Sequence, residues 1–258
     1  METLQADSTA GKRAAITVAA VTVSFGNFVA VNNLSLTLYY GQIRAIIGPN
    51  GAGKTTLLDA ITGNNSPKSG RILLDDRQNL LKMHEAQIAR AGVGRKFQKA
   101  SVFDELLVEQ NLELAVRRKR SRFVRELLVR EKHEIREKIE ELLKVVHLGD
   151  QRREKAGSLS HGQKQWLEIG MLLALESKVL LLDEPVAGMT DDETDRTAAL
   201  VKSLNTPERA IVVIEHDMNF VQNVADMVTV LHEGALLLEG PMEVIKNDPR
   251  VIEIYLGR

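Results

Sequence analysis

The sequence contains no cysteine, no excess of charge of one sign and no long hydrophobic run. Without cysteine there is no disulfide framework, no cysteine-ligated zinc or iron–sulfur cluster and no thiol catalysis, which fits a reducing compartment. The 34 Lys and Arg residues nearly balance the 35 Asp and Glu residues. The net charge of −1 therefore gives no general attraction to nucleic acid, and we expect no nucleic-acid partner.

No stretch of the chain predicts a transmembrane helix. The longest segment without Asp, Glu, Lys or Arg covers residues 14–43, but polar residues interrupt it. Its apolar residues alternate with period two around Leu34, Leu36 and Leu38, which indicates half-buried strands. Residues 1–13 lack the apolar core of a signal peptide. We predict a disordered tail over 1–13 and a soluble chain whose role at a membrane, if any, depends on partners.

Segments typical of strands and of helices alternate along the 258 residues. A strand at Ile43–Ile47 leads into a glycine-rich segment and a helix over Lys54–Ile61. Apolar strands at Val179–Leu182 and Ala210–Ile214 are each followed or preceded by helical periodicity. This alternation predicts an α/β fold with a mainly parallel sheet core. Residues 113–155 hold 23 charged residues out of 43, with apolar residues at helical spacing, which predicts a helical subdomain.

Residues 48–55 match the pattern G-x-x-x-x-G-K-[ST] between a predicted strand and a predicted helix, the context of a phosphate-binding loop (P-loop). Glycines let backbone N–H groups curl around phosphate oxygens, and the positive end of the next helix adds to the attraction. Lys54 is placed to reach the β- and γ-phosphates, and Thr55 to offer a hydroxyl to Mg²⁺. The alternative is a tight turn without ligand. The residues expected to bind nucleotide here are Gly48, Pro49, Asn50, Gly51, Ala52, Gly53, Lys54, Thr55 and Thr56.

The apolar strand at Val179–Leu182 ends in two carboxylates, Asp183 and Glu184. An Asp at the tip of a parallel strand beside a P-loop is placed to hold Mg²⁺, directly or through water. Glu184 is the candidate general base that polarises an attacking water. Taken alone, the pair is equally compatible with an acidic loop after a core strand. The P-loop earlier in the chain favours the catalytic interpretation.

A third motif, Leu159-Ser160-His161-Gly162-Gln163, precedes a predicted helix. Ser160 and Gln163 satisfy the S-x-x-Q capping box, so the segment is also compatible with an ordinary capped helix. The pentapeptide closely resembles the signature LSGGQ, and together the three motifs resemble the ATP-binding subunit of an ABC transporter. The resemblance covers about residues 16–256. His161 stands where the signature usually has glycine, so the implied contact with γ-phosphate rests on Ser160 and Gly162.

The resemblance implies further site residues. Phe25 falls where the family keeps an aromatic residue that stacks on adenine, and Gln98 takes the Q-loop position, which contacts Mg²⁺ or the attacking water. His216 matches the switch histidine that contacts the γ-phosphate, and Ala187–Thr190 lies at the D-loop of the dimer contact. Without the resemblance, a lone Phe in a strand, a surface Gln and a lone His after a strand are usually structural.

The resemblance also implies a fold and a mechanism. The fold is a P-loop NTPase of the ABC ATPase type, with an N-terminal antiparallel β subdomain and a helical subdomain at about 99–175 inside one ATP-binding domain over 14–258. Two ATP-binding subunits, alike or different, pack head to tail, so that the P-loop of one faces Ser160 and Gly162 of the other across ATP and Mg²⁺. Hydrolysis reopens this dimer and moves two transmembrane permease subunits. The expected location is peripheral, at the cytoplasmic face of the cell membrane.

Further segments resemble importer subunits of the hydrophobic amino-acid uptake family, namely Ser158–Glu168, Glu184–Thr190 and Gly240–Gly257. Gly188-Met189-Thr190 together with His161 is most similar to the urea-transporter branch. The resemblance therefore implies the ATPase of a urea importer, served by a solute-binding protein outside the membrane.

Other readings remain at this point. Branched-chain amino acids are the alternative cargo, and a soluble ABC ATPase outside transport is a further alternative. An ABC ATPase of DNA maintenance would need long coiled-coil arms, for which the interval between Gln98 and Leu159 is too short. A P-loop kinase or GTPase would leave Leu159–Gln163 and His216 unexplained.

Overall fold

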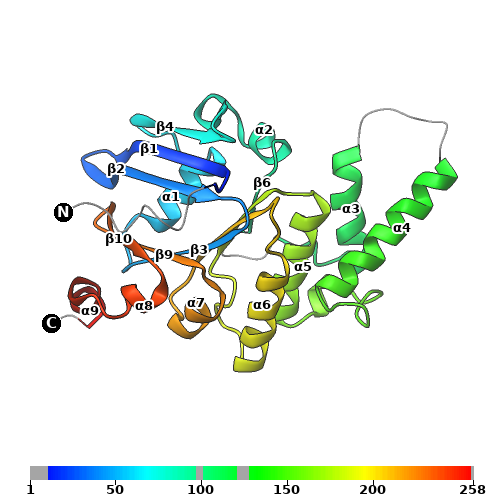
Figure 1. Cartoon of the computed structure of the whole chain (residues 1–258). Helices are drawn as coiled ribbons and strands as arrows, with labels where there is room; N and C mark the ends of the chain where they lie inside the picture. Colours follow the sequence, from blue (N-terminus) through cyan, green and yellow to red (C-terminus); the bar gives the residue numbers. More distant parts are fainter. Residues whose placement is uncertain (1–10, 97–100, 121–127, 257–258) are drawn as a thin grey trace.

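The computed structural model describes residues 11–96, 101–120 and 128–256. Two sheets are stacked with one helix between them, and further helices cover the other side of the larger sheet (Figure 1). Gln98 and residues 1–10 of the predicted tail lie outside the described residues. Within the described part of the chain, no helix has the length and apolar character needed to cross a membrane.

The smaller sheet is antiparallel and has the strand order β2-β1-β4-β5. Its strands are β1 (Ala14–Phe25), β2 (Phe28–Tyr39), β4 (Ser69–Leu74) and β5 (Gln78–Asn79). The alternation around Leu34–Leu38 predicted only the second half of β2, because its first half carries a bulge that breaks the period of two. Val31 pairs with Val23 and Val29 with Ser24, so Ala30 is the extra residue.

The larger sheet has the order β10-β9-β3-β8-β7-β6. It contains β3 (Gln42–Ile47), β6 (Val93–Lys96), β7 (Val179–Asp183), β8 (Ala210–Ile214), β9 (Met227–His232) and β10 (Ala235–Gly240). All neighbouring pairs are parallel except β9 and β10, which confirms the predicted mainly parallel core. Because β3, β8 and β7 are adjacent and parallel, the residues that follow them meet at one edge.

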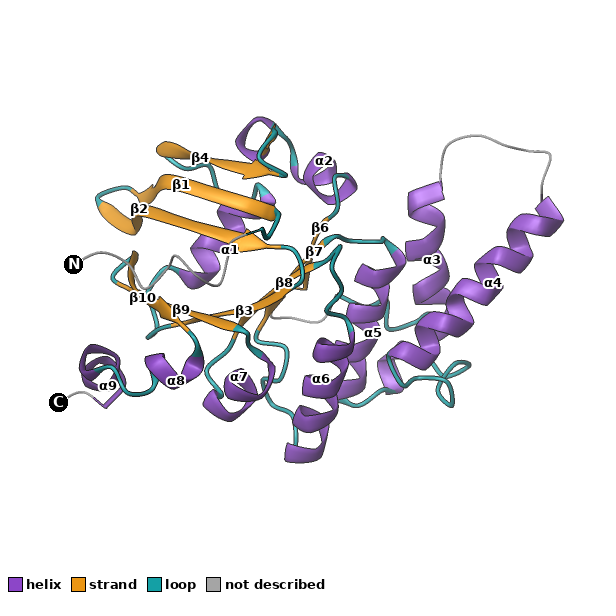
Figure 2. Ribbon diagram, in the orientation of Figure 1, coloured by secondary structure: helices purple, strands orange, loops and turns teal. Residues whose placement is uncertain are grey.

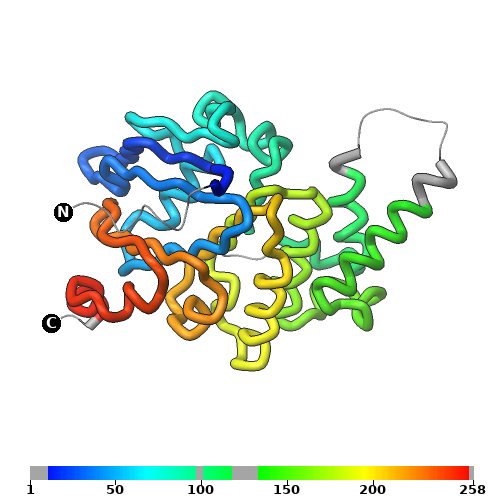
Figure 3. The backbone as a smooth tube through the Cα atoms, viewed as in Figure 1, coloured from blue at the N-terminus to red at the C-terminus, as the bar shows by residue number. Residues whose placement is uncertain are grey.

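Helices cover both faces of the larger sheet (Figure 2). The helical elements are α1 (Lys54–Thr62), the 3₁₀ turn η1 (Leu80–Lys82), α2 (Glu85–Arg90), α3 (Val108–Arg120), α4 (Leu128–Val145), the 3₁₀ turn η2 (Ala156–Ser158), α5 (His161–Ala174), α6 (Asp191–Ser203), α7 (Met218–Val224), α8 (Met242–Ile245) and α9 (Pro249–Leu256). The chain passes from β6 through α3 and α4 and returns by α5 to β7 (Figure 3).

The hydrophobic core has two large parts, one on each face of the larger sheet. One part joins the antiparallel sheet to α1 and to β-strand residues such as Leu181. The other joins α3, α4, α5 and α6 to residues such as Leu180. Since neighbouring residues of a strand point to opposite faces, Leu180 and Leu181 of β7 fix α5 and α1 on opposite sides of the same sheet.

Candidate nucleotide-binding site

The glycine-rich loop between β3 and α1 is closely packed by backbone on both sides. Gly53 is the N-cap of α1 with φ 95°, and a Cβ there would lie 2.4 Å from the Ala30 carbonyl oxygen of the β2 bulge. A Cβ on Gly48 would lie 2.2 Å from the carbonyl oxygen of Leu231 at the end of β9. Glycine at both positions therefore allows the loop to wrap tightly, with Asn50 and Gly51 exposed at its tip.

Lys54 folds back into this loop. Its Nζ donates hydrogen bonds to the carbonyl oxygens of Gly48, at 2.7 Å, and Pro49, at 3.0 Å. Burial lowers the pKa of Lys54, while the charges of Glu184 and Asp183 act in the opposite direction. Thr55 follows it as an exposed residue in the first turn of α1. A buried ammonium, the helix start and the exposed hydroxyl together make this edge suited to a phosphate.

Asp183 lies at the end of β7 and is held by two basic residues of β6 that the sequence analysis did not single out. Arg95 is the more extensively bonded: it donates to Asp183 Oδ2 at 2.8 Å and to Asp59 Oδ1 of α1 at 2.5 Å. Lys96 is fully buried, and its Nζ donates to the Asp183 carbonyl oxygen at 3.1 Å. Arg95 therefore ties the P-loop helix to the strand that carries the carboxylates.

Substitution of Arg95 is expected to destabilise the fold. Arg95→Met leaves Asp183 buried without its guanidinium partner, so the free energy of unfolding should fall by about 3–5 kcal/mol. The measurement is urea denaturation of the purified variant. Arg136→Met is the matched control, because the Arg136–Glu140 pair is exposed and is expected to contribute under about 1 kcal/mol. Equal stability of the two variants would show that the buried bridge does not hold these elements together.

Glu184 and His216 come together at the same edge, after β7 and β8. His216 Nε2 lies 3.5 Å from Glu184 Oε1. Glu184 has φ 47°, an unusual left-handed conformation for a residue with a side chain, and its backbone N–H donates to the Ile214 carbonyl at 2.9 Å. Seven other described residues without functional predictions share this conformation, so the role of Glu184 stays a prediction.

Glu215, which was not singled out from the sequence, hydrogen-bonds to the backbone beside this pair. Its carboxylate is buried and accepts from the backbone N–H groups of Val186, at 2.9 Å, and His216, at 3.0 Å. Burial raises the pKa of Glu215, against the opposing effect of these hydrogen bonds. The sequence did hold a signal for Glu215, because it directly follows a buried strand and a buried carboxylate needs hydrogen-bond partners.

Ser160, His161, Gly162 and Gln163 begin α5, on the opposite face of the sheet from α1. Ser160 is the N-cap and forms a capping box with Gln163, as the sequence predicted. His161 turns its ring along the helix, with Nε2 at 3.1 Å from Gln165 Nε2. Within one chain this motif is therefore separated by the sheet from the P-loop.

Phe25 lies at the end of β1, in the hairpin that joins β1 to β2, and 50% of its surface is exposed. It pairs across the two-residue turn with Phe28, which is 62% exposed. Phe28 was not singled out from the sequence. Ala30, two residues further along β2, has its carbonyl oxygen against Gly53 of the loop.

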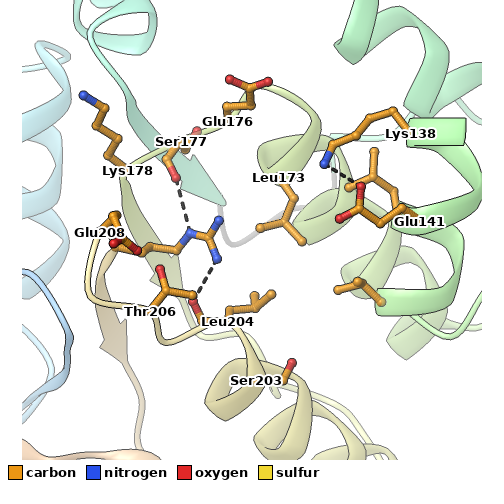
Figure 4. Close-up of a pocket in the computed structure, with 13 residues that line it drawn as sticks. Lys138, Glu141, Leu173, Glu176, Ser177, Lys178, Ser203, Leu204, Thr206 and Glu208 are labelled. Atoms are coloured by element: carbon orange, nitrogen blue, oxygen red, sulfur yellow. Dashed lines mark hydrogen bonds and ion pairs between the residues drawn. The ribbon is translucent and has the colours of Figure 1, made fainter. Parts of the chain in front are cut away.

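A surface hollow of about 500 Å³ lies elsewhere, among α4, the end of α5 and the turn after α6 (Figure 4). Lys138 and Glu141 form an ion pair at its rim. Arg209, another lining residue, donates to the Leu204 carbonyl at 2.8 Å. None of the predicted site residues that the structure describes lines it. Those that the structure describes lie instead where β3, β7 and β8 end, apart from the α5 motif and Phe25, which is at the end of β1.

Comparison with known families agrees with this geometry. The family model described as "ABC transporter" matches residues 31–187, which is more than half of the chain. The chain belongs to the ABC transporter family. It is the ATP-binding subunit of such a transporter, and it is an ATPase. A second model, described as "Branched-chain amino acid ATP-binding cassette transporter", matches residues 235–258, the segment from β10 to the end of the chain.

Two similar curated proteins extend over nearly the whole of this ABC subunit. The high-affinity branched-chain amino acid transport ATP-binding protein BraF of Pseudomonas aeruginosa is 36% identical over 252 residues, covering 95% of this chain and 98% of that protein. The protein LivG of Escherichia coli, with the same description, is 36% identical over 249 residues, covering 94% and 97%. Both names state transport of branched-chain amino acids, and neither mentions urea.

Solved structures confirm the ABC ATPase fold predicted for this subunit. A structure of MJ1267, an ATP-binding cassette of an ABC transporter, superimposes with a TM-score of 0.82 at 27% identity, covering 94% of this chain and 98% of that one. The ADP conformation of the same cassette gives a TM-score of 0.80 at 28% identity, covering 95% and 99%.

Proposed function

We propose that this subunit hydrolyses ATP to drive an importer of branched-chain amino acids. The observation that carries the ATPase site is the convergence of Lys54, Asp183, Glu184 and His216 where β3, β7 and β8 end. The cargo assignment is supported by the match of residues 235–258 and by the names of BraF and LivG. Urea, the cargo first expected from the sequence, is supported only by the local resemblance of residues 188–190 and His161.

In the proposed site the P-loop holds the phosphates of ATP. Lys54 leaves the carbonyls of Gly48 and Pro49 and places its ammonium on the β- and γ-phosphates, where it stabilises the charge that develops during transfer. The exposed hydroxyl of Thr55 and the carboxylate of Asp183 are hard oxygen donors of the kind that Mg²⁺ prefers, so they fit this ion. Bound there, Mg²⁺ neutralises phosphate charge; Gln98 is its third proposed contact.

Glu184 is the proposed base, because its carboxylate lies at the strand edge near Lys54 and His216. It orients and polarises the attacking water. His216, whose Nε2 lies 3.5 Å from Glu184 Oε1, is the proposed contact of the γ-phosphate. Glu215 acts as a positioning residue, since its carboxylate fixes the backbone of both His216 and Val186.

The proposed active form is a dimer of ATP-binding subunits. Ser160, Gly162 and Gln163 lie at the start of α5, on the opposite face of the sheet from α1, so they serve the ATP bound to a second subunit rather than their own. Either a second copy or a different ATPase supplies that subunit. Two permease subunits and an external solute-binding protein complete the proposed importer, with this chain at the cytoplasmic face of the membrane.

Phe25 is proposed to stack on the adenine ring. Phe25→Ala is expected to weaken ATP binding about fivefold or more, because stacking of a base on an aromatic ring contributes about 1–3 kcal/mol. The measurement is isothermal titration with ATP and with inorganic triphosphate, which has no base and whose affinity should stay unchanged. Phe103→Ala is the control, since Phe103 is 54% exposed but precedes α3. Unchanged ATP affinity would leave Phe25 without a nucleotide role.

The importer assignment is tested by transport. The complex is purified from its native membrane through a tag on this chain, reconstituted in vesicles, and supplied with ATP, labelled leucine or labelled urea. ATP-dependent leucine uptake is expected. Uptake of urea alone would reverse the cargo assignment, and recovery of this chain only with soluble partners would overturn transport while leaving the ATPase chemistry in place.

A further inference from the structure

The hydroxyl of Ser160 already has an acidic partner within the chain. Ser160 Oγ donates a hydrogen bond to Glu193 Oε1 of α6 at 3.0 Å. The same carboxylate lies against Gly162 in the first turn of α5, because a Cβ there would be 2.7 Å from Glu193 Oε1. A negative charge thus occupies the start of α5, beside both residues that are proposed to contact the phosphate of a partner-bound ATP.

The second oxygen of Glu193 is anchored on its own helix. Oε2 accepts from the backbone N–H of Thr190, at 3.1 Å, and from its hydroxyl, at 3.3 Å, as part of the capping box of α6. These hydrogen bonds, led by that of the Thr190 backbone, lower the pKa of Glu193 and keep it ionised near neutral pH. The Glu193 side chain therefore links the D-loop end of α6 to the signature end of α5.

A nucleotide phosphate and the Glu193 carboxylate are both negatively charged, and both accept a hydrogen bond from the Ser160 hydroxyl. Ser160 has one hydroxyl proton, so it cannot donate to both at once. Two anions at one helix start also repel each other, at a position where the helix favours a single negative charge. Closure of two subunits over ATP thus requires Glu193 Oε1 to leave Ser160, although Oε2 can stay on Thr190.

We propose that Glu193 holds, in the open subunit, the place at Ser160 that the phosphate of the partner-bound ATP takes on closure. Its carboxylate is an internal competitor that raises the ATP concentration needed to form the closed dimer and helps the signature end of α5 to release phosphate afterwards. This inference rests on the proposed composite site, in which Ser160 contacts the ATP of a second subunit.

The test measures ATP-driven dimerisation by light scattering, in a Glu184→Gln background that binds ATP without turning it over. Glu193→Gln keeps an acceptor for the capping box but removes the charge. Loss of a charge-assisted hydrogen bond should favour release of Ser160 about three- to tenfold at each site. A symmetric dimer breaks two such contacts, so its dissociation constant is expected to fall about ten- to hundredfold.

Asp192→Asn is the matched control, because Asp192 is exposed in the same first turn of α6 and its removal changes the net charge equally. It is expected to alter the dissociation constant less than about twofold. Glu193→Ala, which leaves Ser160 without this acceptor, should tighten the dimer at least as much as Glu193→Gln.

The outcomes separate this inference from the proposed function. A Glu184→Gln parent that dimerises with ATP, and tightens with Glu193→Gln but not with Asp192→Asn, supports both. A parent that dimerises but shows no greater tightening with Glu193→Gln than with Asp192→Asn overturns the role of Glu193 alone. A parent that stays monomeric at saturating ATP overturns the composite site, and the inference falls with it.

Discussion

Lys54→Ala is expected to reduce ATP hydrolysis by about a hundred- to thousandfold, because removal of one preorganised donor from a developing oxyanion has costs of this size. In the structure the Lys54 ammonium is held inside the P-loop by two backbone carbonyls and lies near the charges of Glu184 and Asp183. It is therefore the positive group best placed for the γ-phosphate. The measurement is phosphate release by the purified subunit at saturating ATP and Mg²⁺.

A second lysine variant is the control for effects that loss of any lysine would have on turnover. Lys82→Ala removes an exposed lysine from the 3₁₀ turn η1 and should leave turnover within about twofold of the parent. Circular dichroism of Lys54→Ala establishes that the fold persists. Full turnover in a folded Lys54→Ala protein would refute the phosphate role of the P-loop lysine.

Glu184→Gln is expected to slow hydrolysis by about a hundred- to ten-thousandfold, the contribution typical of a general base. Glutamine has nearly the same shape and can still contact His216, but it cannot take a proton from water. ATP therefore stays bound and its γ-phosphate is kept. If two subunits share each nucleotide, the variant should accumulate as an ATP-dependent dimer, measured by light scattering together with single-turnover hydrolysis.

Glu208→Gln is the comparison for this variant, because Glu208 is exposed in the turn before β8, away from the strand ends that carry the site. It is expected to hydrolyse ATP at the parent rate and to form no lasting dimer. If Glu184→Gln turns over as fast as Glu208→Gln, another group acts as base. If Glu184→Gln is inactive but stays monomeric with ATP, the result supports Glu184 as the base and contradicts a site shared by two subunits.

The sequence predicted best where chemistry and local structure require the same residues. The P-loop could be recognised because its glycines serve both a tight backbone turn and a phosphate, and the buried strand before Asp183 could be read from its apolar run. The antiparallel start was harder. The Ala30 bulge shifts the alternation of β2, so the strand was recognised only from Leu34 although it begins at Phe28.

The residues that could not be predicted are those whose contacts are with residues far away in the sequence. Arg95 and Lys96 are the last two residues of the short strand β6, and local patterns do not predict that Arg95 bonds to both Asp59 and Asp183. Thr190 and Glu193 have the spacing of a capping box, which places Glu193 only in the first turn of α6. Its second contact, to Ser160, spans 33 positions in sequence and follows from the packing of α6 beside α5.

The separation of the P-loop and the α5 motif by one sheet has a consequence for enzymology. If the active form is the proposed dimer, a single subunit carries one half of each of two different reaction centres. The specific activity should therefore rise with protein concentration and fall on dilution. Inside an assembled carrier, the neighbouring subunits bring the halves to millimolar effective concentration, as tethering does for any paired binding modules. Purified protein assayed at nanomolar levels would then underestimate the turnover that the assembled carrier sustains.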